Sequence, residues 1–162
     1  MGHLSTATGR PVDLSTVEPA TLAVFRQGIA LSAVELIEAA EIRNQMTRSV
    51  GSYFSRFDVM LTPTLASLPP PLGRLHADVE QLDGLGWVSR VLNSAPFSSL
   101  ANMSGTPSIS VPLGQDPTTG IPIGMQFGAA FGREDVLLGL AAELEQAAPW
   151  KGRRPPVWTG SD

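Results

Sequence analysis

The stretch from residue 96 to residue 128 constrains the fold more than any other part of the chain. A short helical run is broken at Gly105-Thr106-Pro107, and apolar side chains then alternate with polar or small ones. The apolar positions are Ile109, Val111 and Leu113 and, after a polar turn, Ile121, Ile123, Met125 and Phe127. A period of two is typical of strands with one buried face, so 108–113 and 122–128 are predicted to be paired strands.

Helical patterns lie on both sides of this stretch. A helix is predicted from Thr16 to Ala30, with Pro19 as a possible first residue. Ser32 and Glu35 have the spacing of a capping box, so they predict the start of a long amphipathic helix. The apolar face of that helix comprises Met46, Val50, Tyr53, Phe54 and Phe57. A last helix is predicted after Glu134, with a stripe formed by Val136, Leu137, Leu140, Ala141, Leu144 and Ala148.

A short apolar run follows the long helix. Val59, Met60 and Leu61 are consecutive and stop at Pro63, which predicts a strand over 58–62 that is buried on both faces of a sheet. Helical and strand patterns alternate along the chain. The predicted class is therefore α/β, with part of a mixed β-sheet covered by helices.

Two segments show no regular pattern. Residues 1–15 are predicted to be a flexible N-terminal segment, and 16–162 to form one domain portion. Residues 65–94 contain Pro69-Pro70-Pro71 and several glycines, so they are predicted to be an irregular connection. The buryable side chains in this connection, such as Trp87 and Leu92, favour a pocket wall or lid over disorder.

Composition excludes several classes of protein. The net charge is −4, and Arg153-Arg154 is the only basic cluster, predicted to lie in a solvated tail; no nucleic-acid partner is therefore expected. The chain has no cysteine, so it has no disulfide framework, thiolate zinc site or cysteine nucleophile. No apolar run reaches membrane-spanning length and no secretory signal is visible, so no membrane partner and a cytoplasmic location are expected.

Few side chains in this sequence could support catalysis. His76 with Asp78 could belong to a serine triad, but a lone histidine in a loop is more often a surface residue. No histidines and carboxylates have the spacing of a metal site. Gly124 and Gly128 lie inside a strand pattern, which favours positions of close approach in a sheet over a phosphate-binding loop.

Several spaced motifs resemble the amidase signature family over about residues 33–157. They are Asp58-Val-Met-Leu-Thr-Pro-Thr64, Phe97 followed by Asn102-Met-Ser-Gly-Thr-Pro-Ser-Ile-Ser-Val-Pro112, and Gly120-Ile-Pro-Ile-Gly-Met-Gln-Phe127. The resemblance is to the C-terminal part of that family. Leu68-Pro-Pro-Pro-Leu-Gly73 and Ala148-Pro-Trp150 are similar to the branch that hydrolyses cyclic 6-aminohexanoate oligomers.

The resemblance implies amide hydrolysis without a cofactor or metal, by a lysine, a bridging serine on a cis peptide and a nucleophilic serine. Those residues belong to the family's N-terminal half, so no catalytic residue is expected in this chain. Lys151, the only lysine, matches no catalytic motif. The resemblance also makes Phe97 and Trp87 candidate walls of the acyl pocket for a small-molecule amide, although a plain core role is the simpler interpretation of each.

Three functions remain open from the sequence. The chain could be an inactive part of an amidase, a freestanding binding or interaction module that reuses part of the fold, or a serine hydrolase that uses His76. Half of a sheet would expose unpaired strand edges and apolar surface. Self-association through these edges is therefore predicted.

Overall fold

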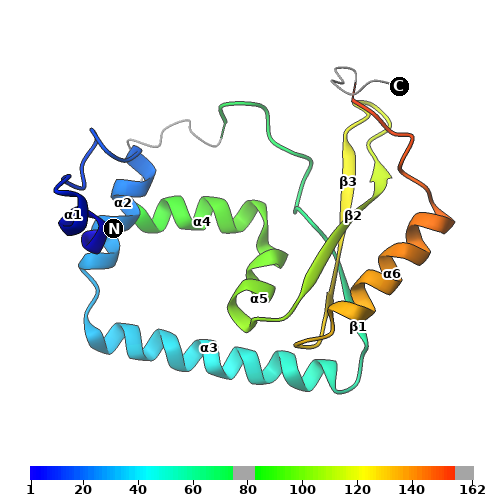
Figure 1. Ribbon diagram of the computed structural model, residues 1–162, viewed down its shortest axis with the longest axis horizontal. Helices are drawn as coiled ribbons and strands as arrows, with labels where there is room; N and C mark the ends of the chain where they lie inside the picture. The colour runs from blue at the N-terminus through cyan, green and yellow to red at the C-terminus, as the bar shows by residue number, and fades with distance from the viewer. Residues whose placement is uncertain (75–82, 156–162) are drawn as a thin grey trace. The chain divides into compact units, whose positions relative to one another are not determined.

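The computed structural model describes residues 1–74 and 83–155. These residues form two compact units (Figure 1). The helical unit comprises residues 1–45 and 66–96, and the sheet unit comprises residues 46–65 together with the chain from residue 97 onward. Helices and strands alternate along the chain, which confirms the predicted α/β class.

The helical unit contains α1 (Gly2–Thr8), α2 (Pro19–Ile29), the first part of α3 (Ala33–Phe54) and α4 (Gly84–Ser94). Residues 1–15 were predicted to be flexible, whereas α1 forms one short helix there. Its end is set by Gly9, which has the left-handed conformation that glycine adopts readily (φ 68°). The predicted start of α2 at Pro19 is confirmed, with Pro19 in the first turn where its missing N–H costs no hydrogen bond.

The predicted capping box at the start of α3 is confirmed. The backbone N–H of Ser32 donates to the Glu35 carboxylate at 2.8 Å, and the N–H of Glu35 donates to the Ser32 hydroxyl at 3.2 Å. Two backbone donors that a helix start leaves unpaired are thereby satisfied. The helix continues through Gly51 to Phe54, and the Phe57 ring stacks on Tyr53 just beyond its end, with ring centroids 4.7 Å apart.

The prediction that residues 65–94 are irregular was wrong for their second half, because α4 occupies Gly84–Ser94. Its start depends on Asp83, whose carboxylate accepts from the Gly86 N–H at 2.6 Å. In the sequence, the glycines at 84 and 86 suggested an interruption of regular structure. Gly84 instead lies directly against α2: a Cβ there would be 2.7 Å from the carbonyl oxygen of Ala23 and 2.7 Å from Cβ of Gln27.

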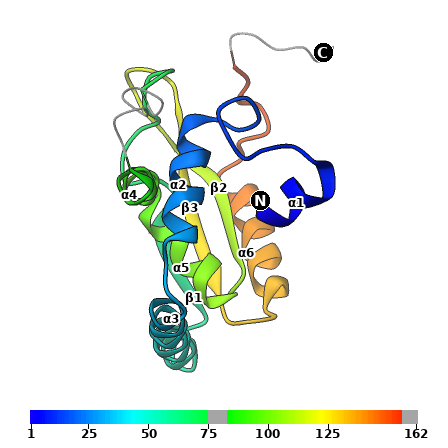
Figure 2. The same cartoon turned by 90° about the vertical axis from the view of Figure 1, so that its left-hand side faces the viewer.

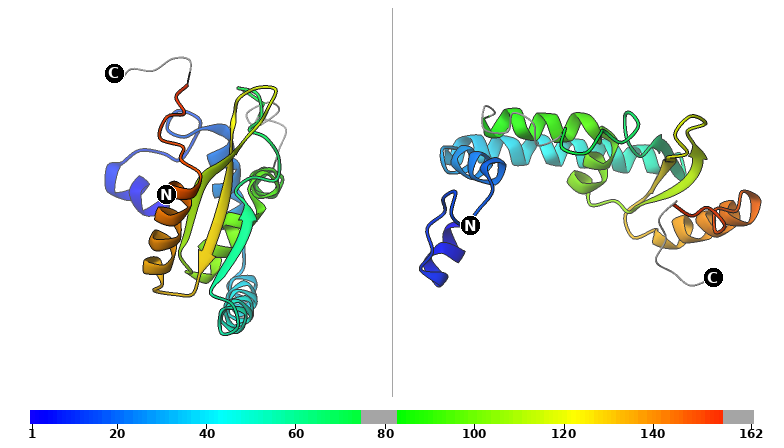
Figure 3. Two further views of the ribbon diagram at one scale, coloured as in Figure 1. Left: turned by 90° about the vertical axis from the view of Figure 1, so that its right-hand side faces the viewer. Right: turned by 90° about the horizontal axis from the view of Figure 1, so that it is seen from above.

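The sheet unit is built on β1 (Val59–Pro63), β2 (Ser108–Gln115) and β3 (Pro122–Ala129). The three strands have the order β1-β3-β2, and both pairs are antiparallel. The left panel of Figure 3 shows β3 between its two neighbours. The predicted pairing of the 108–113 and 122–128 strands is confirmed, with Ile109 opposite Phe127 and a register irregularity between Val111 and Gly114.

The core of the sheet unit lies between the sheet and α6 (Glu134–Ala147), which packs on β2 and β3 (Figure 1). Val111, Phe127, Ala129 and Leu137 are buried there, and Trp150 packs against this cluster from the chain after α6. Of the predicted apolar stripe of the last helix, Leu137, Leu140, Ala141 and Leu144 therefore pack on the core of the sheet. Alternation in β2 and β3 places every second side chain in this core.

The prediction that the first strand is buried on both faces was wrong for this chain. β1 is an edge strand, and the side chain of Leu61 remains 56% exposed. The strand includes Pro63 as its last residue, whereas it was predicted to end before this proline. An edge strand tolerates proline because one side of its backbone has no neighbouring strand to donate to.

At Gly124, side chains from the two neighbouring segments approach the backbone of β3 closely. The hydroxyls of Thr64 and Ser110 lie 2.5 Å apart, and a Cβ on Gly124 would lie 2.6 Å and 2.9 Å from these two oxygens. This confirms Gly124 as a close-approach position.

Arg153 was predicted to lie in a solvated tail, but its guanidinium donates to the carbonyl of Pro112 at 2.9 Å. It therefore ties the chain after α6 to β2.

The α5 helix (Pro96–Ser104) leads into β2. Its predicted end at Gly105 is confirmed, because Gly105 has a left-handed conformation (φ 75°) and its N–H donates to the carbonyl of Ala101 at 2.9 Å. The side-chain amide of Asn102 donates to the carbonyl of Ser98 at 3.1 Å, within the same helix. The helix end thus directs the chain into the strand.

Candidate functional site

One hollow of the helical unit lies between α2 and α4, which pack together although they are far apart in the sequence (Figure 2). Gly84 sets the closest point of approach, because it brings the backbone of α4 against Ala23 on α2. Side chains from both helices line a hollow beside this contact. The resulting α2–α4 cleft has a volume of about 450 Å³.

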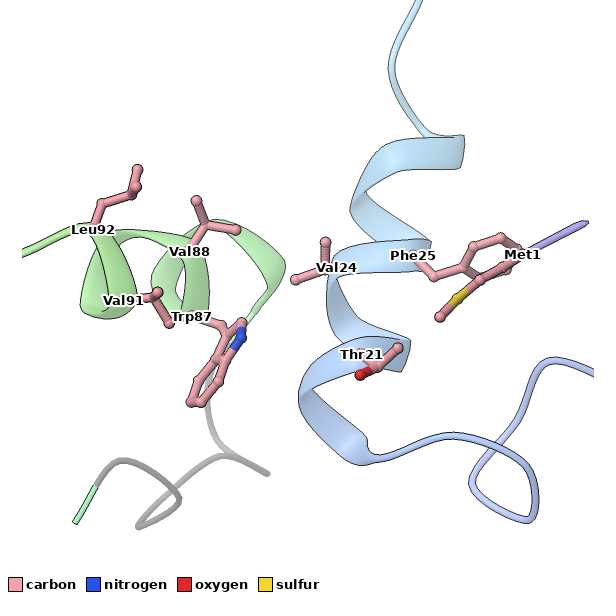
Figure 4. Close-up of a pocket in the computed structure, with 8 residues that line it drawn as sticks. All are labelled: Met1, Thr21, Val24, Phe25, Trp87, Val88, Val91 and Leu92. Atoms are coloured by element: carbon pink, nitrogen blue, oxygen red, sulfur yellow. The ribbon is translucent and has the colours of Figure 1, made fainter. Parts of the chain in front are cut away.

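Nearly all of the lining of the α2–α4 cleft is apolar. The lining residues are Met1, Thr21, Val24, Phe25, Trp87, Val88, Val91 and Leu92. Figure 4 shows Val24 pointing toward α4, whereas Phe25 lies beside Met1. Only the hydroxyl of Thr21 and the indole N–H of Trp87 add side-chain polar groups. Clefts of this size and character suit apolar parts of small ligands, with few polar groups to orient them.

Trp87 and Phe97, the two candidate pocket walls, belong to different units of the chain. Trp87 lies on α4 and lines the α2–α4 cleft. Phe97 lies on α5 in the sheet unit, where it is half-buried. The position of His76 lies outside the described residues, so the triad hypothesis has no geometry to support it.

The α2 side of the cleft was not predicted from the sequence. Thr21, Val24 and Phe25 were assigned to a helix without a role. Their contribution depends on a helix that was itself not predicted, since the cap of α4 at Asp83 was overlooked. The available signal was Asp83 followed by apolar residues at Val88, Val91 and Leu92, which have helical spacing.

A second hollow of about 510 Å³ lies between the proline-rich segment and the last turns of α4. Its lining is more polar, and it comprises Ser67, Leu68, Pro69, Pro70, Pro71, Arg74, Arg90, Asn93 and Ser94. The N–H of Ala66 donates to the carbonyl of Ser94 at 3.2 Å, which fixes the start of the proline-rich segment beside the end of α4. The proline-rich segment predicted as a pocket wall thus borders a hollow, separate from the α2–α4 cleft.

The carboxylates with perturbed pKa values serve local structure. The Ser32 backbone N–H and then its hydroxyl lower the pKa of Glu35, and the Thr119 hydroxyl and N–H lower the pKa of Asp116 in the β2–β3 turn. Hydrogen bonds from Arg133 lower the pKa of Asp135 at the start of α6. Each of these three carboxylates is held by a neighbour two or three residues away, so these groups stabilise turns and helix starts.

Other site classes find no support in the parts of the chain that the structure describes. No group of three or more histidine and acidic side chains there could hold a metal ion. Lys151 is exposed in the turn after α6. Among the described helices, none is long and apolar enough to cross a bilayer by itself, and α2 and α3 meet that test only jointly, across a bend of 103°.

Comparison with known proteins places these features in a larger fold. An amidase of Mycobacterium leprae, AmiC, is 38% identical over 147 residues, which are 89% of this chain and 30% of that protein. A 6-aminohexanoate-cyclic-dimer hydrolase of Paenarthrobacter ureafaciens is 42% identical over 104 residues, which are 62% of this chain and 21% of that protein. The chain therefore spans about 30% or less of these relatives.

Solved structures agree with the sequence relatives. The structure of a 6-aminohexanoate cyclic dimer hydrolase matches 94% of this chain with a TM-score of 0.78 and 29% identity, and the match covers 32% of that protein. A bacterial aryl acylamidase matches 95% of this chain with a TM-score of 0.64 and 25% identity. The family model described as amidase matches residues 6–138. The chain belongs to the amidase family.

Proposed function

We propose that this chain forms the C-terminal part of an amidase, a hydrolase of carbon–nitrogen amide bonds, and is inactive by itself. The observation that carries the proposal is family membership over most of the chain combined with coverage of about 30% of the relatives. The catalytic lysine and two serines would then lie in the part of the fold that this chain does not span. A serine oxygen would attack the amide carbon, the amine would leave, and water would release the acyl group.

The α2–α4 cleft supports a role in binding the substrate's apolar part. The cleft is lined by aliphatic and aromatic groups, and Trp87 presents the largest of these surfaces. A relative's name refers to a cyclic dimer of 6-aminohexanoate, whose methylene chains are apolar. We therefore assign to this chain an amide substrate whose acyl part is apolar.

The first experiment measures the intact mass of the purified chain after incubation with a serine-directed fluorophosphonate. An unchanged mass is expected, together with no hydrolysis of simple amides. The chain is then mixed with the portion of the Mycobacterium leprae amidase that this chain does not match. Hydrolysis should appear in the mixture, with the adduct on the added polypeptide. A stoichiometric adduct on this chain alone would refute the proposal.

The second experiment tests the cleft in that mixture. Trp87→Ala should raise KM for an amide with an apolar acyl chain by roughly tenfold, because it removes a large apolar contact surface. The matched control is Leu85→Ala, which lies on the same helix but does not line the cleft. Equal effects of the two substitutions on KM would contradict a role for the cleft in binding substrate.

A further inference from the structure

The hollow between the proline-rich segment and α4 brings together two arginine side chains of the helical unit. Arg74 ends the turn after the proline-rich segment, and Arg90 lies on α4. Both line the hollow, which we call the Arg74–Arg90 hollow. None of the described residues that line it is acidic. Its lining side chains therefore carry positive charge and no negative charge.

A tight turn places Arg74 at this hollow. The N–H of Arg74 donates to the carbonyl of Pro71 at 3.1 Å, which closes a four-residue turn. Gly73, the third residue of the turn, has a φ of 84°, the left-handed conformation that a type II turn requires at this position. Pro69, Pro70 and Pro71 have restricted φ angles, so the wall that leads to Arg74 is stiff.

Helical spacing places the other polar groups on one face of α4. Arg90, Asn93 and Ser94 are related by i, i+3 and i+4, so they lie along the same side of the helix. The hydroxyl of Ser94 donates to the carbonyl of Val91 at 2.7 Å, within the helix. The two guanidiniums and the Asn93 amide therefore supply N–H donors to the hollow. The described lining thus combines N–H donors with no carboxylate, which suits an anion.

The apolar part of the lining indicates the kind of anion. Arginine binds both carboxylate and phosphate through paired N–H donors. Leu68 and the three prolines contribute apolar surface to the same hollow. A compact phosphate would leave that surface in contact with water, whereas the aliphatic chain of a carboxylic acid would cover it. The lining therefore favours an aliphatic carboxylate over a phosphate.

We propose that the Arg74–Arg90 hollow binds the carboxylate of an aliphatic ligand, with the ligand's chain against Leu68 and the prolines. Hydrolysis of an amide produces a carboxylate, and an amide substrate can carry another one at the far end of its acyl chain. The inference rests on the proposed function only for these two sources of the ligand. The site is separate from the α2–α4 cleft, which is lined by no charged side chain.

The test titrates the purified chain with hexanoate at pH 7 and follows the side-chain amide of Asn93 by nuclear magnetic resonance. Saturable binding of hexanoate is expected. Hexanamide, its uncharged analogue, and inorganic phosphate should each bind about tenfold more weakly, because one lacks the charge and the other the chain. Arg74→Gln should weaken hexanoate binding about tenfold for the same reason.

The matched control is Arg26→Gln. Arg26 is an exposed arginine of the same unit, on α2 and outside the hollow, so this variant removes the same charge. It should change hexanoate binding by less than about twofold, since salt screens distant charges. Arg90→Lys is a second variant that keeps the charge on α4. It should weaken binding about threefold or more, because lysine cannot donate two parallel N–H bonds. Far-UV circular dichroism would verify that the helices remain in every variant.

Three outcomes would overturn the carboxylate site. The first is no saturable binding of hexanoate by the unmodified chain. The second is binding of hexanamide or phosphate as tight as that of hexanoate. The third is an equal loss of affinity in Arg74→Gln and Arg26→Gln.

Kinetics of the chain mixed with the unmatched portion of the Mycobacterium leprae amidase distinguish the two sources of the carboxylate. If it belongs to the substrate, Arg74→Gln should raise KM for the monoamide of adipic acid about tenfold more than KM for hexanamide. If it belongs to the product, Arg74→Gln should raise the inhibition constant of hexanoate about tenfold and change both KM values by the same factor.

Failure of the proposed function is distinguishable from failure of this site. Absence of hydrolysis in the mixture, together with hexanoate binding that depends on Arg74, would contradict the proposed function and leave the carboxylate site intact. Hydrolysis in the mixture without hexanoate binding would do the reverse.

Discussion

The sheet unit and the helical unit bury their apolar side chains in different ways. In the sheet unit, Val111, Phe127 and Leu137 meet in one core built from segments that follow one another along the chain. In the helical unit, α2 and α4 are separated by more than fifty residues, and α2 buries only Ala20 and Leu22. Local alternation of apolar residues is sufficient to predict the first arrangement. The second arrangement depends on contacts between distant segments.

The difference also bears on function. The sheet unit buries one apolar cluster, whereas the helical unit leaves a cleft between α2 and α4 and exposed apolar side chains on α3. Binding surfaces commonly lie where a fold leaves apolar groups uncovered. The helical unit is therefore where the proposed contact with the substrate lies.

The largest expected effect is in the core of the sheet unit. Phe127→Ala removes a buried ring between the sheet and α6, so it should lower the free energy of unfolding by about 3–5 kcal/mol. Urea unfolding followed by amide hydrogen exchange would locate the loss in β2, β3 and α6. The control Phe131→Ala removes a ring that is 81% exposed and should change stability by less than about 0.5 kcal/mol. Equal losses would show that the assigned core is not the stabilising one.

An intermediate effect is expected where α4 meets α2. Gly84→Ala places a methyl group 2.7 Å from atoms of Ala23 and Gln27, so the helices must separate, at a cost of about 1–3 kcal/mol. Gly28→Ala on α2 meets nothing within 4 Å and should be neutral or stabilising by up to about 1 kcal/mol. Thermal unfolding would compare them. If Gly84→Ala were as stable as Gly28→Ala, the α2–α4 contact would be refuted.

The smallest expected effect is the pH dependence of the two capped turns. The hydrogen bonds of Ser32 lower the pKa of Glu35, so the ionised carboxylate stabilises the fold. That contribution is complete above the usual glutamate pKa of 4.5 and is lost as the pH falls through the lowered value. Asp116 should behave in the same way in the β2–β3 turn. Its contribution is complete above the usual aspartate pKa of 3.8 and is lost as the pH falls through the lowered pKa.

Amide hydrogen exchange between pH 6 and pH 3 would separate these two contributions. Glu35→Gln should remove the acid sensitivity at the start of α3 only, and Asp116→Asn that of the β2–β3 turn only. Ser32→Ala, which removes the helix cap itself, should cost about 1 kcal/mol at neutral pH. Acid sensitivity that persisted at α3 in Glu35→Gln would contradict this assignment.

The sequence by itself determined the strands and most of the helices. Alternation at Ile109, Val111 and Phe127 predicted the β2–β3 pair, because a strand exposes its side chains to two faces in turn. Ser32 and Glu35 predicted the start of α3, since a capping box is a contact between residues three positions apart. The spaced motifs also indicated the amidase family. All of these signals are local or arranged in sequence order.

Only the tertiary structure decided three other features. It assigned β1 to a sheet edge, which leaves Leu61 exposed despite the apolar run around it. It also turned Gly84 from an apparent helix breaker into the contact point between α4 and α2, and so created the cleft that Trp87 lines. The physical reason is common to all three. Whether an apolar or small residue is covered depends on which distant segment packs against it, and no local pattern encodes that neighbour.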